Sequence, residues 1–471
     1  MSRAPVTRRP LVAVAAVVAL ALSFASPASA KDTEGAWSEP FRIGIVAIHS
    51  VLLHTGEVLM AEQPGDDGSR ARLYDADTGE VSNVTIRRPR DFFCAGHTVL
   101  PDGRVLVAGG SVYGTFGSPG VRETDLFDPV TKTWSHSGLM AARRWYPTAV
   151  TLPNGRILVF SGQNMRKTIT HVEEYNPESQ QFQTLPGSAD KRLDLYPRMI
   201  LLPNGKLLWA GQEQMTWMFD PASASWSRVG RMSSTRYEGT AVLLPGLDRV
   251  LTLGGYGDRG VTNTADIIDL TAPKPAWRPT APMHFRRESA NAVLLLDGTV
   301  LVTGGRSDFS TSRRAEIFDP VTETWSVMAA AKAGRQYHST SVLLPDGRVL
   351  SAGEDFGPYR ETGELFAPPY LFKGVRPRIT SAPALAHYGQ SLAVSFADAS
   401  HISRVALVRP GSVTHSVNFD QRYVDLSYSV NGSSITATAP ASGRLAPPGW
   451  YMLTVLNEKA VPSEAAWVNL G

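Results

Sequence analysis

The sequence is poor in cysteine and in long runs of charged or of apolar residues. It holds a single cysteine, Cys94, among 471 residues, so no disulfide can form within the chain. No cluster of lysine and arginine gives the basic footprint of a nucleic-acid-binding surface, so we expect no nucleic-acid partner. The glycine-rich segment GGYGDRG at 254 opens no helical pattern and therefore does not fit a dinucleotide-binding fingerprint.

The one apolar run lies at the amino terminus. Residues 1–30 pass from three arginines through an apolar stretch to Ala28-Ser29-Ala30, the pattern of a signal-peptidase site. The run is shorter than the roughly 20 residues that cross a bilayer comfortably, so we expect residues 1–30 to be a removed signal peptide and the protein to be secreted. The pair Arg8-Arg9 also fits a twin-arginine signal. Removal leaves 43 basic against 43 acidic residues and no membrane span.

A repeat organises the chain as far as residue 375. A strand-like apolar run, a turn such as Pro-Asp-Gly or Pro-Asn-Gly, and a second apolar run ending in glycine recur seven times, about 42 to 52 residues apart. The copies begin near residues 51, 98, 149, 199, 241, 292 and 341. Most continue with a third segment such as DLFDP or EIFDP and a fourth that carries tryptophan, as at Trp134, Trp226, Trp277 and Trp325. Four strands per repeat predict a seven-bladed Kelch-type β-propeller over 31–375.

The carboxy-terminal residues follow a different pattern. From 376 to 471 the period disappears, and alternating segments such as SLAVSFADAS and GWYMLTVLN are separated by turn residues. This pattern predicts an immunoglobulin-like β-sandwich. The fold class is therefore all-β, with two domains.

One phase of the repeat collects chemically unusual side chains. Blades are related by rotation about one axis, so residues at one phase form a ring around that axis. The position seven residues before the turn proline, and its equivalent in the sixth copy, hold Cys94, Tyr146, Tyr196, Glu238, Ser289 and His338, and Tyr237 and Tyr337 come one residue earlier in their copies. Imidazole and phenolate ligands together favour Cu(II) over zinc, and a free thiol beside copper would be oxidised unless it were buried or part of the site.

Several long segments resemble the galactose oxidase and glyoxal oxidase family of copper radical oxidases. DFFCAGHTVLPDGRVLVAGG resembles the cysteine segment of that family, and RRWYPTAVTLPNGR resembles its radical-tyrosine segment. GRQYHSTSVLLPDGRVLSAG resembles its Tyr-His pair, and VTHSVNFDQRYVDL resembles the carboxy-terminal loop that delivers a second histidine.

The resemblance implies a complete copper site with one ion. Tyr146 would be an equatorial ligand joined to Cys94 through a thioether that stores a radical. His338 and His415 would be imidazole ligands, and Tyr337 an axial ligand and general base. His415 lies outside the repeats and follows from the resemblance alone. The implied reaction oxidises a small primary alcohol or hydrated aldehyde with dioxygen and releases hydrogen peroxide, in a protein that we expect to be monomeric.

Two departures from galactose oxidase bear on the substrate. This chain begins its first blade soon after the leader, where galactose oxidase has a carbohydrate-binding domain, and it reads Ser161-Gly162-Gln163-Asn164 where that enzyme has a tryptophan stacked on the thioether. Both favour a small alcohol or aldehyde over galactose. Trp145, beside the radical tyrosine, is a candidate shield. His97, Tyr196, Arg198 and Tyr237 are further candidates for substrate contact or support of the site.

Two other functions fit parts of the sequence. A non-catalytic propeller that binds glycans or proteins predicts a free Cys94 and no metal dependence. A sialidase-like hydrolase would use Tyr237 and Glu238, but it needs a cluster of arginines at the mouth that this phase of the repeat does not show.

Overall fold

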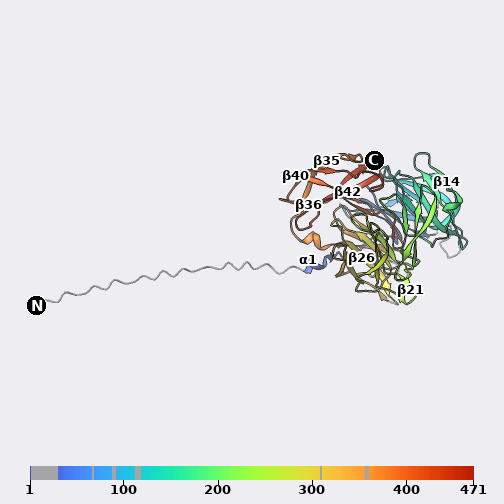
Figure 1. The fold of residues 1–471 in the computed structure, drawn as a ribbon, viewed down its shortest axis with the longest axis horizontal. Coiled ribbons are helices and arrows are strands. Elements are labelled where there is room, and N and C mark those ends of the chain that lie inside the picture. Colours follow the sequence, from blue (N-terminus) through green and yellow to red (C-terminus); the bar gives the residue numbers. More distant parts are fainter. Residues whose placement is uncertain (2–29, 66–67, 87–91, 112–117, 308–309, 356–359) are drawn as a thin grey trace.

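The structure is a computed structural model of the whole chain. It describes residue 1 and residues 30–471 except 66–67, 87–91, 112–117, 308–309 and 356–359 (Figure 1). The predicted signal peptide therefore lies almost entirely outside the described residues. Among the described residues, no helix is long and apolar enough to cross a membrane.

Each of the seven sequence repeats begins with an antiparallel strand pair, as predicted. The pairs are β3 (His49–Leu52) with β4 (Glu57–Gly65), β7 (Gly96–Val99) with β8 (Val105–Ala108), β10 (Thr133–Thr151) with β11 (Ile157–Asn164), β15 (Met199–Leu201) with β16 (Leu207–Trp209), β19 (Thr240–Leu243) with β20 (Arg249–Leu253), β25 (Glu288–Leu294) with β26 (Val300–Ser307), and β30 (Ser339–Leu343) with β31 (Val349–Gly353). The blade count of seven remains a prediction from the repeat.

Third and fourth strands complete most of these units. The third strands are β5 (Gly68–Asp75), β9 (Val121–Asp128), β13 (Glu173–Asn176), β17 (Met215–Asp220), β23 (Ala265–Asp269), β28 (Arg314–Asp319) and β32 (Thr362–Ala367). Outer strands include β6 (Val81–Val84), β14 (Gln181–Thr184), β18 (Ser225–Arg231), β24 (Trp277–Thr280) and β29 (Thr324–Ala330). Three of the four outer tryptophans pack on a phenylalanine of the adjacent strand: Trp325 on Phe318 and Trp226 on Phe219 with ring centroids 4.9 Å apart, and Trp134 on Phe127 at 5.0 Å. The fourth, Trp277, lies opposite Ile268. The contact with phenylalanine explains why tryptophan recurs in the fourth segment of the repeat.

Strand β10 departs from the expected pattern. It is a single strand of 19 residues that pairs with β9 of one repeat and with β11 of the next, so the two units share one eight-stranded sheet. Register shifts on either side of Leu139 let the strand bend between the two pairings.

Strands from both ends of the chain complete the propeller sheets. The amino-terminal strands β1 (Ala36–Trp37) and β2 (Phe41–Arg42) pair with β32 in the sheet of the last repeat. The carboxy-terminal hairpin of β37 (Ser412–Thr414) and β38 (Val417–Asn418) extends the first sheet, because β37 pairs with β3. A segment of the second domain therefore lies against the inner strand of a propeller blade.

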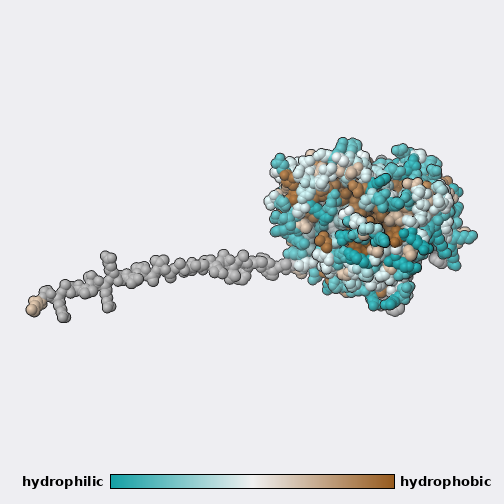
Figure 2. Space-filling view, in the orientation of Figure 1, coloured by the Kyte–Doolittle hydropathy of each residue, from teal (hydrophilic) through white to brown (hydrophobic). Residues whose placement is uncertain are grey.

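The remaining carboxy-terminal strands form a two-sheet sandwich, as predicted. One sheet contains β33 (Arg378–Ser381), β35 (Ser391–Ala397), β41 (Ser434–Thr438) and β40 (Tyr428–Asn431). The other contains β34 (Leu385–Ala386), β43 (Ala466–Leu470), β42 (Gly449–Asn457), β36 (Ile402–Arg409) and β39 (Arg422–Asp425). One apolar cluster joins this sandwich to the propeller, since Leu243 and Val250 belong to the same buried group as Val405 and Tyr451. The surface in Figure 2 is mostly hydrophilic, with apolar side chains gathered toward its centre.

Four inner strands are anchored by buried ion pairs. In the third, fifth, sixth and seventh repeats, an arginine near the first strand contacts a carboxylate of the third strand: Arg144 with Glu173, Arg236 with Asp266, Arg287 with Glu316, and Arg335 with Glu364. Their side chains are at most 3% exposed. Because breaking one partner would leave a buried charge uncompensated, these pairs fix each inner strand relative to its blade.

Candidate copper site

The phase predicted to converge has one backbone conformation. Cys94, Tyr146, Tyr196, Glu238, Ser289 and His338 all have φ between 48° and 63°, in the left-handed region. Main-chain hydrogen bonds link neighbours in this ring: Tyr146 N donates to Cys94 O at 2.8 Å, and Tyr196 N donates to Tyr146 O at 2.9 Å. The strain of a left-handed residue is thereby offset by a bond between adjacent blades.

Donor atoms gather inside this ring. Cys94 Sγ and one ring nitrogen each of His338 and His415 lie within 4.8 Å of one another. The hydroxyl oxygens of Tyr146 and Tyr337 are 3.0 Å apart, and both of those rings contact the His415 ring edge to face. The structure therefore brings together all five residues predicted for the copper site.

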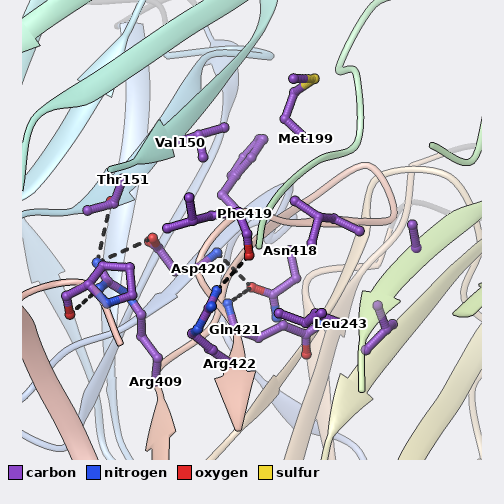
Figure 3. Close-up of a pocket in the computed structure, with 15 residues that line it drawn as sticks. Val150, Thr151, Met199, Leu243, Arg409, Asn418, Phe419, Asp420, Gln421 and Arg422 are labelled. Atoms are coloured by element: carbon purple, nitrogen blue, oxygen red, sulfur yellow. Dashed lines mark hydrogen bonds and ion pairs between the residues drawn. The ribbon is translucent and has the colours of Figure 1, made fainter. Parts of the chain in front are cut away.

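His415 is delivered by the hairpin that enters from the second domain. It follows β37 directly and has φ of 47°. Figure 3 shows the adjoining segment, with Asp420 pointing toward Arg409 beside Thr151. Asp420 accepts hydrogen bonds from Thr98 Oγ1 at 2.7 Å and Val99 N at 2.9 Å. These buried bonds to the propeller hold the hairpin in place.

The same segment borders a small cavity near Figure 3's centre. The Gln421 side chain makes two hydrogen bonds to the main chain of β25, each 3.0 Å long: its Nε2 donates to Ala292 O, and its Oε1 accepts from Leu294 N. Arg422 Nη1 donates to Leu201 O at 2.9 Å. The cavity has a volume of about 50 Å³, and its charged side chains already bond to protein atoms. These side chains fix the hairpin against the propeller and are not free to bind a ligand.

Hydrogen bonds determine which nitrogen each imidazole presents. Thr414 Oγ1 donates to Ile48 O at 2.8 Å, so it accepts from His415 Nδ1 at 2.6 Å. His338 Nδ1 lies 2.6 Å from Asp355 Oδ1 and donates to that carboxylate. In the neutral form of either ring Nε2 is therefore the nitrogen without a proton, and His338 Nε2 is buried with no hydrogen-bond partner. A ligating histidine needs this arrangement, with one nitrogen donating to a neighbour and the other free for a metal.

Burial controls the charge of the other donors. Desolvation raises the pKa of the Cys94 thiol and the Tyr337 phenol well above their usual values, and it also raises the pKa of Tyr146. Burial lowers the pKa of His415 well below its usual value, so that imidazole is neutral. The site thus presents neutral nitrogen and oxygen donors around an orphaned imidazole nitrogen. This donor set fits a divalent copper ion, whose charge would favour deprotonation of the phenols.

A tryptophan of its own strand packs against Tyr146 at a tilt. Trp145 is 2% exposed, and its ring centroid lies 4.8 Å from that of Tyr146 at an interplanar angle of 43°. Asn164, where the tryptophan of galactose oxidase was expected, instead accepts a hydrogen bond from Gly120 N at 3.3 Å. The ring next to Tyr146 therefore comes from the preceding residue.

The other candidate residues take different places. Tyr196 packs edge to face on Tyr146, but its hydroxyl donates to Ala95 O at 2.9 Å, which directs it to the main chain. Arg198 is 5% exposed and its Nε has no hydrogen-bond partner. Burial lowers the pKa of Arg198 to about 10. Tyr237 is 57% exposed. Of these, only Arg198 has a buried polar atom still free to bind.

The hydrolase alternative finds little support in the geometry. Glu238 accepts a hydrogen bond from Ser289 Oγ. Arg236, Arg287 and Arg335, which flank the same phase, are occupied by buried carboxylates. They cannot form the arginine cluster that a sialidase-like site requires.

Three supporting residues were missed by the sequence reasoning. Asp355 and Thr414 orient the two imidazoles, and His49 accepts a hydrogen bond from Cys94 N at 3.1 Å. Asp355 follows the hairpin of the seventh repeat, and Thr414 lies in the second domain directly before His415. A signal for His49 did exist, because histidines occur in the inner strands of two adjacent repeats, at His49 and His97.

Comparison with known proteins identifies related sequences across both domains. Residues 61–228 match the family described as Glyoxal oxidase N-terminus, residues 289–330 match the Kelch motif, and residues 376–470 match the Galactose oxidase-like, Early set domain. A galactose oxidase of Gibberella zeae is 29% identical over 93% of this chain and 70% of its own length. The Aldehyde oxidase GLOX of Vitis pseudoreticulata is 27% identical over 97% of this chain and 99% of its own length.

A solved structure shares the fold. A fungal alcohol oxidase of the AA5 family, solved in complex with copper, superposes with a TM-score of 0.82 at 24% identity, covering 93% of this chain and 99% of that one. Matches on both sides of the domain junction, in the expected order, agree with the motifs and with the all-β fold. The chain is therefore similar to the galactose oxidase and glyoxal oxidase family in both of its parts.

Proposed function

We propose that this protein is a secreted copper radical oxidase that converts a small primary alcohol or hydrated aldehyde to the next oxidation state, with dioxygen as acceptor and hydrogen peroxide as product. The observation that carries the proposal is the convergence of Cys94, two tyrosines and two histidines whose Nε2 atoms both face the centre. The relatives named galactose oxidase and aldehyde oxidase, and the copper-bound alcohol oxidase, support the same reaction class.

Four side chains would hold the ion. His338 and His415 would bind it through Nε2, and Tyr146 and Tyr337 through their hydroxyl oxygens. When bound, copper supplies positive charge that acidifies nearby hydroxyls and a second place for an oxidising equivalent. The buried surroundings exclude competing water and strengthen each electrostatic contact.

The chain's own residues divide the reaction between a base and a radical. With copper bound, Tyr337 would be held as the phenolate, whose Oη accepts the proton of the substrate hydroxyl. The Tyr146-Cys94 pair, once joined by a thioether, takes a hydrogen atom from the substrate carbon. Overall the substrate loses two electrons and two protons, which dioxygen takes up as hydrogen peroxide. Trp145 covers the Tyr146 ring and limits access to it.

Copper addition in air tests this proposal. Purified metal-free protein should lose two hydrogen atoms by intact mass after Cu(II) is added, gain a radical absorption band, and then form peroxide from primary alcohols or aldehydes. Cys94→Ser is the matched control, since it keeps a small polar side chain but cannot form the thioether. Full alkylation of Cys94 after copper treatment would contradict the proposal and favour a binding propeller.

A further inference from the structure

A buried chain of hydrogen bonds runs from the Cys94 main chain through two histidines that are not among the proposed copper ligands. His49 Nε2 is 3.1 Å from Cys94 N, His49 Nδ1 is 3.1 Å from His97 Nε2, and His97 Nδ1 is 2.5 Å from Ser412 Oγ. His49 is 5% exposed, His97 2% and Ser412 0%. The proposed reaction uses none of these three side chains.

The direction of every bond follows from one fixed donor. Cys94 N–H can only donate, so His49 Nε2 accepts and the proton of that ring sits on Nδ1. His49 Nδ1–H then donates to His97 Nε2, which leaves the proton of His97 on Nδ1 to donate to Ser412 Oγ. Ser412 completes the chain by donating to His97 O at 3.3 Å. Each ring nitrogen has one partner and one role.

This chain of hydrogen bonds fixes the position of the Cys94 main chain and does not conduct protons. It ends at a backbone amide, which does not release its proton, so it offers no exit toward the substrate. Both nitrogens of each imidazole are already engaged, one as donor and one as acceptor, so neither ring can take up a further proton without breaking a bond of the chain. Two neutral rings with fixed tautomers act as a rigid brace.

We propose that His49, His97 and Ser412 are positioning residues that hold the Cys94 main chain in its left-handed conformation, so that its sulfur faces Tyr146 for thioether formation. This inference rests on the proposed function. Cys94 has φ of 55°, which is strained for a residue other than glycine. The main-chain N–H of Tyr146 and that of Tyr196 are held by a carbonyl of the neighbouring blade, whereas Cys94 N–H is held by the His49 side chain.

The brace also connects Cys94 to the second domain. Ser412 and His415 lie on the same hairpin, and β37 of that hairpin pairs with the strand that carries His49. Cys94 Sγ in turn lies 3.4 Å from His415 Nε2. Seating of the hairpin therefore sets the cysteine and the second histidine ligand together, so the cross-link forms only in a protein whose two domains have docked.

The brace serves the formation of the thioether. A carbon-sulfur bond forms between Cys94 Sγ and the Tyr146 ring, while one S–H and one ring C–H bond break. Two electrons and two protons leave, and dioxygen takes them up as hydrogen peroxide. Since the rate depends on how closely the sulfur is held against the ring, a displacement of the Cys94 main chain slows the step.

The test compares variants of the brace in the full chain. His49→Leu removes the acceptor for Cys94 N, and His49→Gln restores an acceptor near the position of Nε2. Ser412→Ala releases the far end. His54→Leu is the matched control, because His54 stacks on Trp450 with ring centroids 4.4 Å apart, away from the site. Thioether formation is timed by intact mass after Cu(II) addition in air, and hydrogen exchange of the Cys94 peptide reports on its amide.

We expect His49→Leu to slow cross-linking about tenfold to a hundredfold and to speed exchange of the Cys94 peptide, while His49→Gln stays near the native rate and His54→Leu matches it. Ser412→Ala should cross-link at a rate between those of His49→Leu and the native protein. If His49→Leu does not fold, the rate of Ser412→Ala tests the inference in its place. A folded His49→Leu or Ser412→Ala protein that cross-links at the native rate overturns the inference. Failure of the native protein to cross-link instead overturns the proposed function.

Discussion

Removal of the Asp355 carboxylate should weaken copper binding without touching a ligand. His338 Nδ1 donates to Asp355 Oδ1 at 2.6 Å, which fixes the ring orientation and leaves Nε2 free for the metal. Loss of such a partner typically weakens metal affinity about 10- to 100-fold, or about 1.4 to 2.7 kcal/mol. We expect this loss for Asp355→Ala. Asp355→Asn should lose less, because its amide oxygen still accepts the bond but carries no charge.

The assay is a competition titration of Cu(II) between the protein and a chelator, carried out without oxygen so that no cross-link forms. Asp102→Ala is the control, since Asp102 is an exposed carboxylate that bonds to Arg104 on a surface turn. His338→Ala sets the scale for loss of a ligand. The reasoning is refuted if Asp355→Ala binds copper as tightly as the native protein while His338→Ala does not.

Three further outcomes concern stability. Glu316→Gln, which leaves Arg287 buried without its anion, should lower the free energy of unfolding by about 3 to 5 kcal/mol in urea titrations, whereas Glu323→Gln at a more exposed pair should cost about 1 kcal/mol or less. Phe318→Ala should cost about 3 to 5 kcal/mol, because the ring is fully buried; a smaller loss would mean that the blade collapses around the gap. His97 has a folded pKa of about 3 against 6.5, so the unfolded chain binds the extra proton and stability should fall by about 1.4 kcal/mol per pH unit as pH drops from 6 to 4. A His97→Gln protein should show a shallower fall, and equal slopes would contradict this assignment.

The repeat carried much of the architecture and part of the site. Turn chemistry and strand-length apolar runs identified the hairpins, and rotation about one axis was enough to bring Cys94, Tyr146 and His338 together. His415 could not be reached this way, since its place depends on a hairpin from the second domain pairing with β3. Only the family resemblance supplied it.

Other features depend on tertiary contacts that no local pattern encodes. Asp355 is one of many acidic residues in the sequence, and its role arises only because its carboxylate reaches His338. The continuous strand β10 was expected as an outer strand and a separate inner strand, because Trp134 and Tyr146 belong to different repeats. Backbone bonding on both sides joined them into one element.

Strand β10 also has a consequence for folding. Its first half completes the sheet next to Cys94, and its second half carries Tyr146 into the following sheet. Where blades are joined by a loop, one can open while its neighbour stays closed, but a shared strand makes two sheets lose or gain their order together. Cys94 and Tyr146, the two residues of the proposed cross-link, thus lie in a single cooperative unit, and slow-exchanging amides should run without interruption across the pair of sheets.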